Sequence, residues 1–316
     1  MTELVQNILA GDKRAIAKGI SLVENSSEHS DELLKSLYKH TGKAFVIGIT
    51  GPPGSGKSTL TNCLTKLLRK NNLKVGVICV DPTSPFTGGA LLGDRIRMQE
   101  NVEDENVFIR SMATRGSLGG LSKKAKEACE ILDASGKDFI IIETVGVGQS
   151  ELDIAQTADT TIVVLVPESG DSVQTMKAGL MEIGDIFVVN KSDRDGSDAL
   201  GTALRTMLHL KMKRESDRET PVVKTVATMN KGIDELYDFV QMHKKYLNEK
   251  GKLESKRKDN LIKQINELVN SELGVTFWSE ERKNILEQSL DEILSRETTP
   301  YDFVDELFSE IEINKI

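Results

Sequence analysis

The chain has 316 residues, of which 38% are hydrophobic and 28% charged, and its formal net charge is −8 at pH 7. This length suits one large α/β domain with helical additions, or two modest domains. No segment approaches the ~20 consecutive apolar residues that cross a bilayer, and the acidic balance leaves no basic footprint for nucleic acid, so we expect neither a membrane nor a nucleic acid as partner.

The amino terminus and the cysteines indicate the compartment. Residues 1–10 contain no basic cluster ahead of an apolar run, so they do not resemble a secretion signal. Cys63, Cys79 and Cys129 are odd in number and have no C-x-x-C spacing, which argues against a disulfide framework and against a thiolate metal site. We therefore expect a cytoplasmic protein.

Helical periodicity opens the chain. Apolar residues recur at three-and-four spacing, as in Leu4, Ile8 and Leu9 and again in Ile16 and Ile20. This pattern predicts a helical N-terminal extension over residues 1–43, packed on the domain that follows.

A strand-then-helix alternation fills residues 44–249. Continuous apolar, β-branched runs, which are typical of strands buried on both faces of a parallel sheet, occur at 44–50, 74–81, 107–112, 139–144, 160–166, 186–190 and 221–227. Amphipathic helical patterns separate them. The fold class predicted is α/β, with a doubly wound, mainly parallel sheet.

Beyond about Ile233 the helical pattern continues to the end without further strands. Residues 250–316 are predicted to form a helical C-terminal arm, entered through the lysine-rich stretch 250–258. Its apolar stripes exceed what the sheet needs for cover, so we expect a homodimer joined through the arm. The alternative is an arm that folds back as an ordinary helical subdomain.

A phosphate-binding loop lies between the first predicted strand and the following helix. The motif G-x-x-x-x-G-K-[ST] is matched by Gly51, Pro52, Pro53, Gly54, Ser55, Gly56, Lys57 and Ser58, and Thr59 continues into the helix. Backbone N–H groups of such a loop surround phosphate oxygens at a helix N-terminus, and Lys57 supplies charge to the β- and γ-phosphates. The Ser58 hydroxyl is placed to ligate Mg²⁺.

A guanine-recognition motif follows the sixth predicted strand. In Asn190-Lys191-Ser192-Asp193, the carboxylate can accept hydrogen bonds from guanine N1 and N2, which adenine does not offer. This pattern favours GTP and GDP over ATP. After the last strand, the segment Thr225, Val226, Ala227 and Thr228 would offer backbone donors to guanine O6.

Three acids are candidates for the metal, and two of them, Asp94 and Glu143, are also candidates for catalysis beside Lys57. Asp81 and Glu143 end predicted strands and Asp94 lies in a glycine-rich segment, so with Ser58 they could hold Mg²⁺ directly or through water. Which of them touch the metal stays open.

Gly146 is placed to sense a γ-phosphate. Val147 stands where many GTPases have a water-orienting Gln, so hydrolysis should be slow unless a partner, Gln149 or Lys177 completes the site.

The chain resembles the MeaB/ArgK family of P-loop GTPases. The phosphate loop and the runs 80–84, 93–98, 110–116 and 143–151 carry the resemblance, together with Asp171, Gln174 and Lys177. It implies a GTPase chaperone that gates adenosylcobalamin loading and protects or reactivates an acyl-CoA mutase such as methylmalonyl-CoA mutase. It also implies a homodimer and switch segments that include Val147, Gly148, Gln149, Asp171, Gln174 and Lys177.

Two other functions stay open. An older interpretation of the family that the chain resembles makes it a kinase linked to transport of basic amino acids, and a P-loop fold can phosphorylate an acceptor, although no acceptor pocket is evident. A metal-insertion GTPase is the other. It would need clustered His or Cys ligands, whereas the four histidines and three cysteines are scattered.

Overall fold

The computed structural model describes residues 1–82, 101, 103–114, 120–144, 150–167, 179–215 and 219–309. These residues divide into two compact units, Met1–Arg257 and Lys258–Ile316. None of the helices in the described ranges combines the length and apolar content that a bilayer crossing requires.

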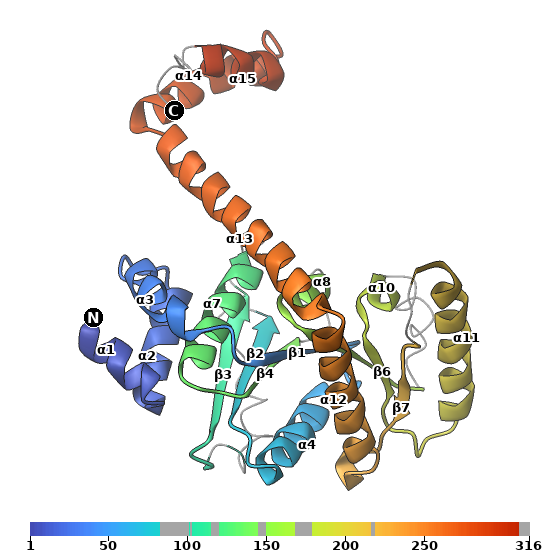
Figure 1. Ribbon diagram of the computed structural model, residues 1–316. Coiled ribbons are helices and arrows are strands. Elements are labelled where there is room, and N and C mark those ends of the chain that lie inside the picture. The colour runs from blue at the N-terminus through green and yellow to red at the C-terminus, as the bar shows by residue number, and fades with distance from the viewer. Residues whose placement is uncertain are drawn as a thin grey trace. The chain divides into compact units, whose positions relative to one another are not determined.

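A seven-stranded parallel sheet forms the centre of the first unit, counted over the described residues (Figure 1). The strands are β1 Phe45–Thr50, β2 Val75–Pro82, β3 Val107–Thr114, β4 Phe139–Thr144, β5 Thr160–Leu165, β6 Ile186–Val189 and β7 Val222–Lys224. Their order across the sheet is β3-β2-β4-β1-β5-β6-β7, and every pairing is parallel. Each strand coincides with a run predicted from the sequence, so the predicted α/β fold is confirmed.

Helices cover both faces of the sheet and explain why the strand sequences are continuously apolar. The helices of the first unit are α1 Thr2–Leu9, α2 Lys13–Glu24, α3 Ser30–Leu37, η1 Tyr38–His40, α4 Lys57–Lys70, α7 Gly120–Ala134, α8 Ser150–Thr157, α10 Met181–Ile183, α11 Ser197–Glu215, η3 Ala227–Met229 and α12 Ile233–Glu249. All residues of β4, β5 and β6 are buried.

The core is split by the sheet. On one face, α4 and α12 pack on alternate residues of β1, β2 and β5. On the other, α1 to α3 join α7 and α8 over β2 and β4, and α11 packs on β5 and β6. The predicted N-terminal helices therefore complete the cover of the sheet, since Ile8, Ile16 and Ile20 are fully buried.

Helix α13 (Lys252–Phe277) begins in the first unit and continues into the second, which also contains α14 (Glu280–Ser295) and α15 (Pro300–Ser309). Within the second unit, the Phe277 and Phe308 rings stack with centroids 4.8 Å apart, and Phe303 and Leu307 are buried. Through this small cluster, the C-terminal end of α13 packs against α15.

Candidate functional site

The phosphate-binding loop lies at the carboxyl end of β1, where parallel strands place ligand sites. The loop runs directly into α4, which begins at Lys57. Gly51 has φ 138°, and a Cβ there would lie 2.1 Å from the Val164 carbonyl oxygen. Gly56 has φ 87°, and its Cβ would lie 2.4 Å from Asn190 Nδ2. Only glycine fits at both positions, so the neighbouring strands and Asn190 fix the motif glycines sterically.

Lys57 folds back over the loop from the first turn of α4. Its Nζ donates to the carbonyl oxygens of Gly51 at 2.8 Å and Pro52 at 3.0 Å, and the residue is 6% exposed. A buried ammonium held over a glycine-rich loop at a helix N-terminus concentrates positive potential there. The arrangement suits oxygen atoms of a bound phosphate.

Ser58 and Glu143 meet beside the loop. Ser58 Oγ donates to Glu143 Oε1 at 2.5 Å, and both residues are buried. Glu143 lies near the end of β4, in register with Ile49 of β1 and Cys79 of β2, so the sheet itself carries the carboxylate to the loop. A hydroxyl and a carboxylate are hard oxygen donors and fit the ligand preference of Mg²⁺.

Asn190 links the phosphate loop to the 225–228 loop, two segments that are far apart in the sequence. Its Nδ2 donates to the Ser55 carbonyl oxygen at 2.9 Å, while its Oδ1 accepts from Thr225 Oγ1 at 3.0 Å and from the Ala227 N–H at 3.2 Å. The side chain is thus buried between the phosphate loop and the 225–228 loop. Thr225 was expected from the sequence only as a backbone donor, and its hydroxyl contact with Asn190 was not predicted, because nothing in the local sequence marks the partner of that hydroxyl.

The rest of the guanine motif is less buried than Asn190, with Lys191 and Ser192 half-buried. Lys191 adopts φ 54°, and the turn is closed by the Arg194 N–H donating to the Lys191 carbonyl oxygen at 3.0 Å. Asp193 is exposed on this turn. The Ser192 N–H donates to the Thr225 carbonyl oxygen at 3.0 Å, which holds the turn against the 225–228 loop.

The 225–228 loop is mostly buried. Val226 and Ala227 are inside and Thr228 is exposed. The Ala227 N–H, expected to meet guanine O6, donates to Asn190 in this structure, and the Ala227 carbonyl oxygen accepts from Cys63 Sγ at 3.2 Å. Its polar backbone atoms thus position the loop.

Several predicted residues lie outside the described parts. These are Asp94, Gly146, Val147, Gly148, Gln149, Asp171, Gln174, Lys177 and the side chain of Asp81. The backbone of Asp81 is described, and it pairs with Ala113 at the carboxyl end of β2. Within the described residues, no group of three or more His, Cys, Asp or Glu side chains could hold a metal ion.

Four features together define the class of P-loop GTPases. They are a glycine-rich loop between β1 and α4, a buried lysine over that loop, a Ser–carboxylate pair beside it and a guanine-recognition turn at the end of β6. A family model described as methylmalonyl Co-A mutase-associated GTPase MeaB matches residues 16–282. The chain therefore belongs to the MeaB family, and its enzyme class is GTP hydrolase.

Relatives share nearly the whole chain. A Pyrococcus abyssi protein whose name describes it as a GTPase is 50% identical over 98% of this chain and 96% of its own. GTPase ArgK of Escherichia coli is 34% identical over 95% of this chain and 93% of its own. A solved structure titled LAO/AO transport system kinase has a TM-score of 0.73 and 27% identity, covering 98% of this chain and 96% of that one.

Proposed function

We propose that this GTPase is a chaperone for an adenosylcobalamin-dependent acyl-CoA mutase, that it uses Mg²⁺, and that it selects guanine through Asp193. The observation that carries the nucleotide chemistry is the buried Ser58–Glu143 contact beside the phosphate loop. The family description, which names a mutase-associated GTPase, supports the partner.

Each residue of the site has a role in this proposal. The loop N–H groups and the N-terminus of α4 bind the phosphates, and Lys57 exchanges its loop carbonyls for β- and γ-oxygens. Ser58 and Glu143 hold Mg²⁺ directly or through water, and the ion offsets charge on the phosphates. The exposed carboxylate of Asp193 accepts from guanine, while Asn190 keeps the two loops in register.

Binding and turnover assays test the nucleotide part. Calorimetry should give tight binding of GTP and GDP and none of ATP. Glu143→Gln should raise the Mg²⁺ concentration that GTP turnover requires. Glu103→Gln, which changes an exposed acid that precedes β3, should leave this concentration unchanged. Tight ATP binding, or an unaltered Mg²⁺ dependence in Glu143→Gln, would contradict these assignments.

The mutase partnership is tested by single-turnover hydrolysis with and without a cobalamin-dependent mutase from the same host. Val147 in place of a water-orienting Gln predicts slow intrinsic turnover and a partner that accelerates it, since positioning and added charge can be worth ~10³–10⁵. By linkage, a mutase that prefers the GTP form must tighten GTP binding by the same factor. An unchanged rate together with no complex would remove the chaperone function.

A kinase remains the second candidate, since the LAO/AO transport system kinase structure shares the fold. Product analysis separates the two, because a hydrolase releases inorganic phosphate and a kinase transfers it to an acceptor. The described residues contain no His and Cys cluster to carry a metal cargo, so a metal-insertion role has no support there.

The proposed homodimer rests on the second unit. Exposed apolar residues follow one side of α13 at helical spacing and continue in the helices beyond it: Leu261, Ile262, Ile265, Leu268, Val269, Leu273, Leu290, Leu294, Val304 and Phe308. Sedimentation should give a dimer that Leu273→Glu dissociates and Lys263→Glu does not. A monomer at high concentration would refute the proposal.

A further inference from the structure

A cavity opens at the amino ends of the strands, at the opposite end of the sheet from the phosphate loop. Its volume is about 480 Å³, within the range of small-molecule sites. Residues just before β1, β2 and β4 line it together with α1, η1 and α12, and they are Leu9, His40, Lys43, Leu73, Asp133, Ala134, Gly136, Lys137, Asp138, Phe139 and Lys244.

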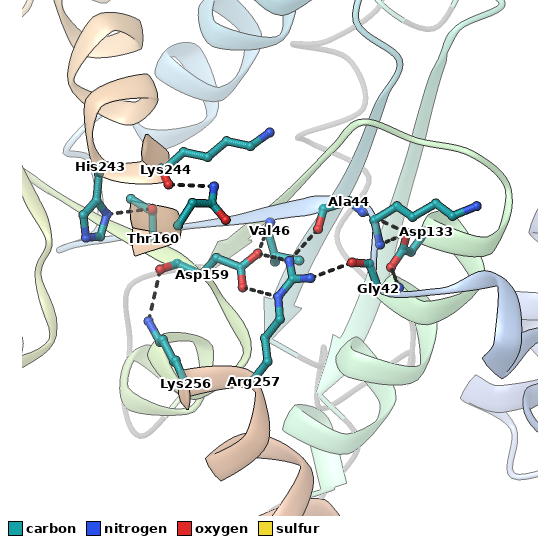
Figure 2. A network of polar contacts seen from close by, with 12 residues as sticks. Gly42, Ala44, Val46, Asp133, Asp159, Thr160, His243, Lys244, Lys256 and Arg257 are labelled. Carbon is teal, nitrogen blue, oxygen red and sulfur yellow. Dashed lines mark hydrogen bonds and ion pairs between the residues drawn. The ribbon is translucent and has the colours of Figure 1, made fainter. Parts of the chain in front are cut away.

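Three lysines and two aspartates line this cavity, and the aspartates are already engaged by the backbone. Asp133 accepts from the N–H groups of residues 42, 43 and 44 at 2.5, 3.2 and 2.9 Å (Figure 2). Asp138 Oδ2 accepts from the Lys74 N–H at 2.7 Å. These carboxylates fix the loops around the cavity, and no ion pair within the described structure joins them to Lys137 or Lys244.

Lys137 is the most buried of the three lysines, with 5% of the residue exposed. Its Nζ donates to the Asn106 carbonyl oxygen at 3.4 Å, which is a long hydrogen bond. Burial first, and then the nearby charges of Lys13, Lys74 and Arg69, lower the pKa of Lys137 to about 8. The charge of Asp104 raises the pKa of Lys137, but Asp104 Oδ2 is already paired with Arg69 Nε at 2.8 Å. Three basic side chains therefore act on Lys137, and one of them, Arg69, is paired with the opposing acid.

Lys244 approaches the same cavity from α12. Its Nζ lies 4.7 Å from the Phe139 ring centroid and 5.2 Å from that of Phe45. Burial lowers the pKa of this lysine too, against the pull of Asp138 and Asp159. Contact with aromatic faces replaces only part of the hydration that a buried ammonium group loses. An anion between Lys137 and Lys244 would therefore be attracted by both ammonium groups.

We propose that the cavity binds a small organic anion whose phosphate or carboxylate group lies between Lys137 and Lys244. The apolar part of the ligand would contact Leu9, Leu73 and Phe139, which line the cavity beside the lysines. Lysine binds phosphate as a point charge, and an apolar wall adds affinity for an organic group over a bare ion. This site is separate from the nucleotide site and does not rest on the proposed mutase partnership.

The test uses the full chain, labelled with ¹³C-lysine and saturated with GDP and Mg²⁺ so that the phosphate loop is filled. Inorganic phosphate and phenyl phosphate are titrated against chloride at constant ionic strength. We expect saturable shifts of the Lys137 and Lys244 Cε–Hε signals, with phenyl phosphate binding about threefold or more tightly than phosphate. The pKa of Lys137, which burial lowers to about 8, should rise on binding, because an anion favours the ammonium form.

Variants complete the experiment. Lys137→Met and Lys244→Met should each weaken phenyl phosphate about tenfold, whereas Lys245→Met should not, since Lys245 is exposed on the same helix and paired with Glu249. GDP affinity reports whether each variant is folded. If Lys137→Met does not fold, the wild-type titration and Lys244→Met decide the question. Absence of a saturable shift, equal affinity of the two probes, or unchanged binding in Lys244→Met would overturn the proposal.

Discussion

Asn190 should stabilise the fold as well as the nucleotide site, which distinguishes it from the other residues of the guanine motif. Replacing it by Ala removes three hydrogen bonds and leaves the Ser55 carbonyl, the Thr225 hydroxyl and the Ala227 N–H without that partner. A net ~1 kcal/mol for each bond gives about 3 kcal/mol. A loss of this size is a large part of the 5–15 kcal/mol that holds a typical domain folded.

Denaturant unfolding measures this loss, and GDP titration measures its effect on the site. We expect Asn190→Ala to lower the free energy of unfolding by about 3 kcal/mol and to weaken GDP more than about tenfold, because the phosphate loop loses its tie to the 225–228 loop. Asn248→Ala is the matched control, an exposed Asn on α12 that donates to the Lys244 carbonyl oxygen at 2.9 Å. Equal stability of Asn190→Ala and Asn248→Ala would refute the bridging role.

Three further outcomes can be measured. Lys57→Ala should abolish GTP turnover, because it removes the charge over the phosphate loop; full activity by phosphate release would show that the site is wrongly assigned. Asp193→Asn should shift preference from guanine to xanthine nucleotides in competition binding, with little change in stability, since Asp193 is exposed. Burial raises the pKa of Glu127 to about 7, so its stabilising contribution is complete below pH 4.5 and is lost as pH rises to 7. Glu127→Gln should therefore be more stable than wild type at pH 8 by about 1–2 kcal/mol, reduced from about 3 by relaxation around the charged carboxylate; unfolding curves that coincide at pH 8 would contradict this.

The sheet could be predicted from the sequence because its strands are buried on both faces. Short continuous apolar runs separated by helical patterns are typical of such strands, and a strand lies at each of the seven runs. The predicted seventh strand, 221–227, is longer than β7, Val222–Lys224. The difference arises because Val226 pairs with Lys231 across a tight turn, which ends the parallel pairing and forms the 225–228 loop.

The site was predictable where one short segment carries the chemistry. The phosphate loop needs φ values and close approaches that only glycine permits, so its spacing is visible in the sequence. The partners of Asn190 were not visible, since Ser55 is 135 residues away and Thr225 35 residues away. Asp133, which closes the 42–44 loop from about 90 residues away, has no local signature either.

Arg257, within the predicted arm (residues 250–316), has partners far away in the sequence that no local pattern marks. It binds Asp159, with Nε to Oδ1 at 3.0 Å and Nη2 to Oδ2 at 2.7 Å (Figure 2). Arg257 also donates to the carbonyl oxygens of Gly42 and Ala44 at 2.7 and 2.8 Å. Asp159 is buried, and its Oδ2 accepts from the Val46 N–H at 2.8 Å.

A charge pair in that position makes the first turns of α13 part of the GTPase unit. Removing Arg257 would leave the buried Asp159 carboxylate without its cation, which costs about 3–5 kcal/mol, and would free two loop carbonyls before β1. Asp159 lies two residues after the end of α8 and immediately before β5. The first turns of α13 are therefore fixed to the connection between α8 and β5, so a shortened chain that keeps an intact GTPase unit has to extend through Arg257.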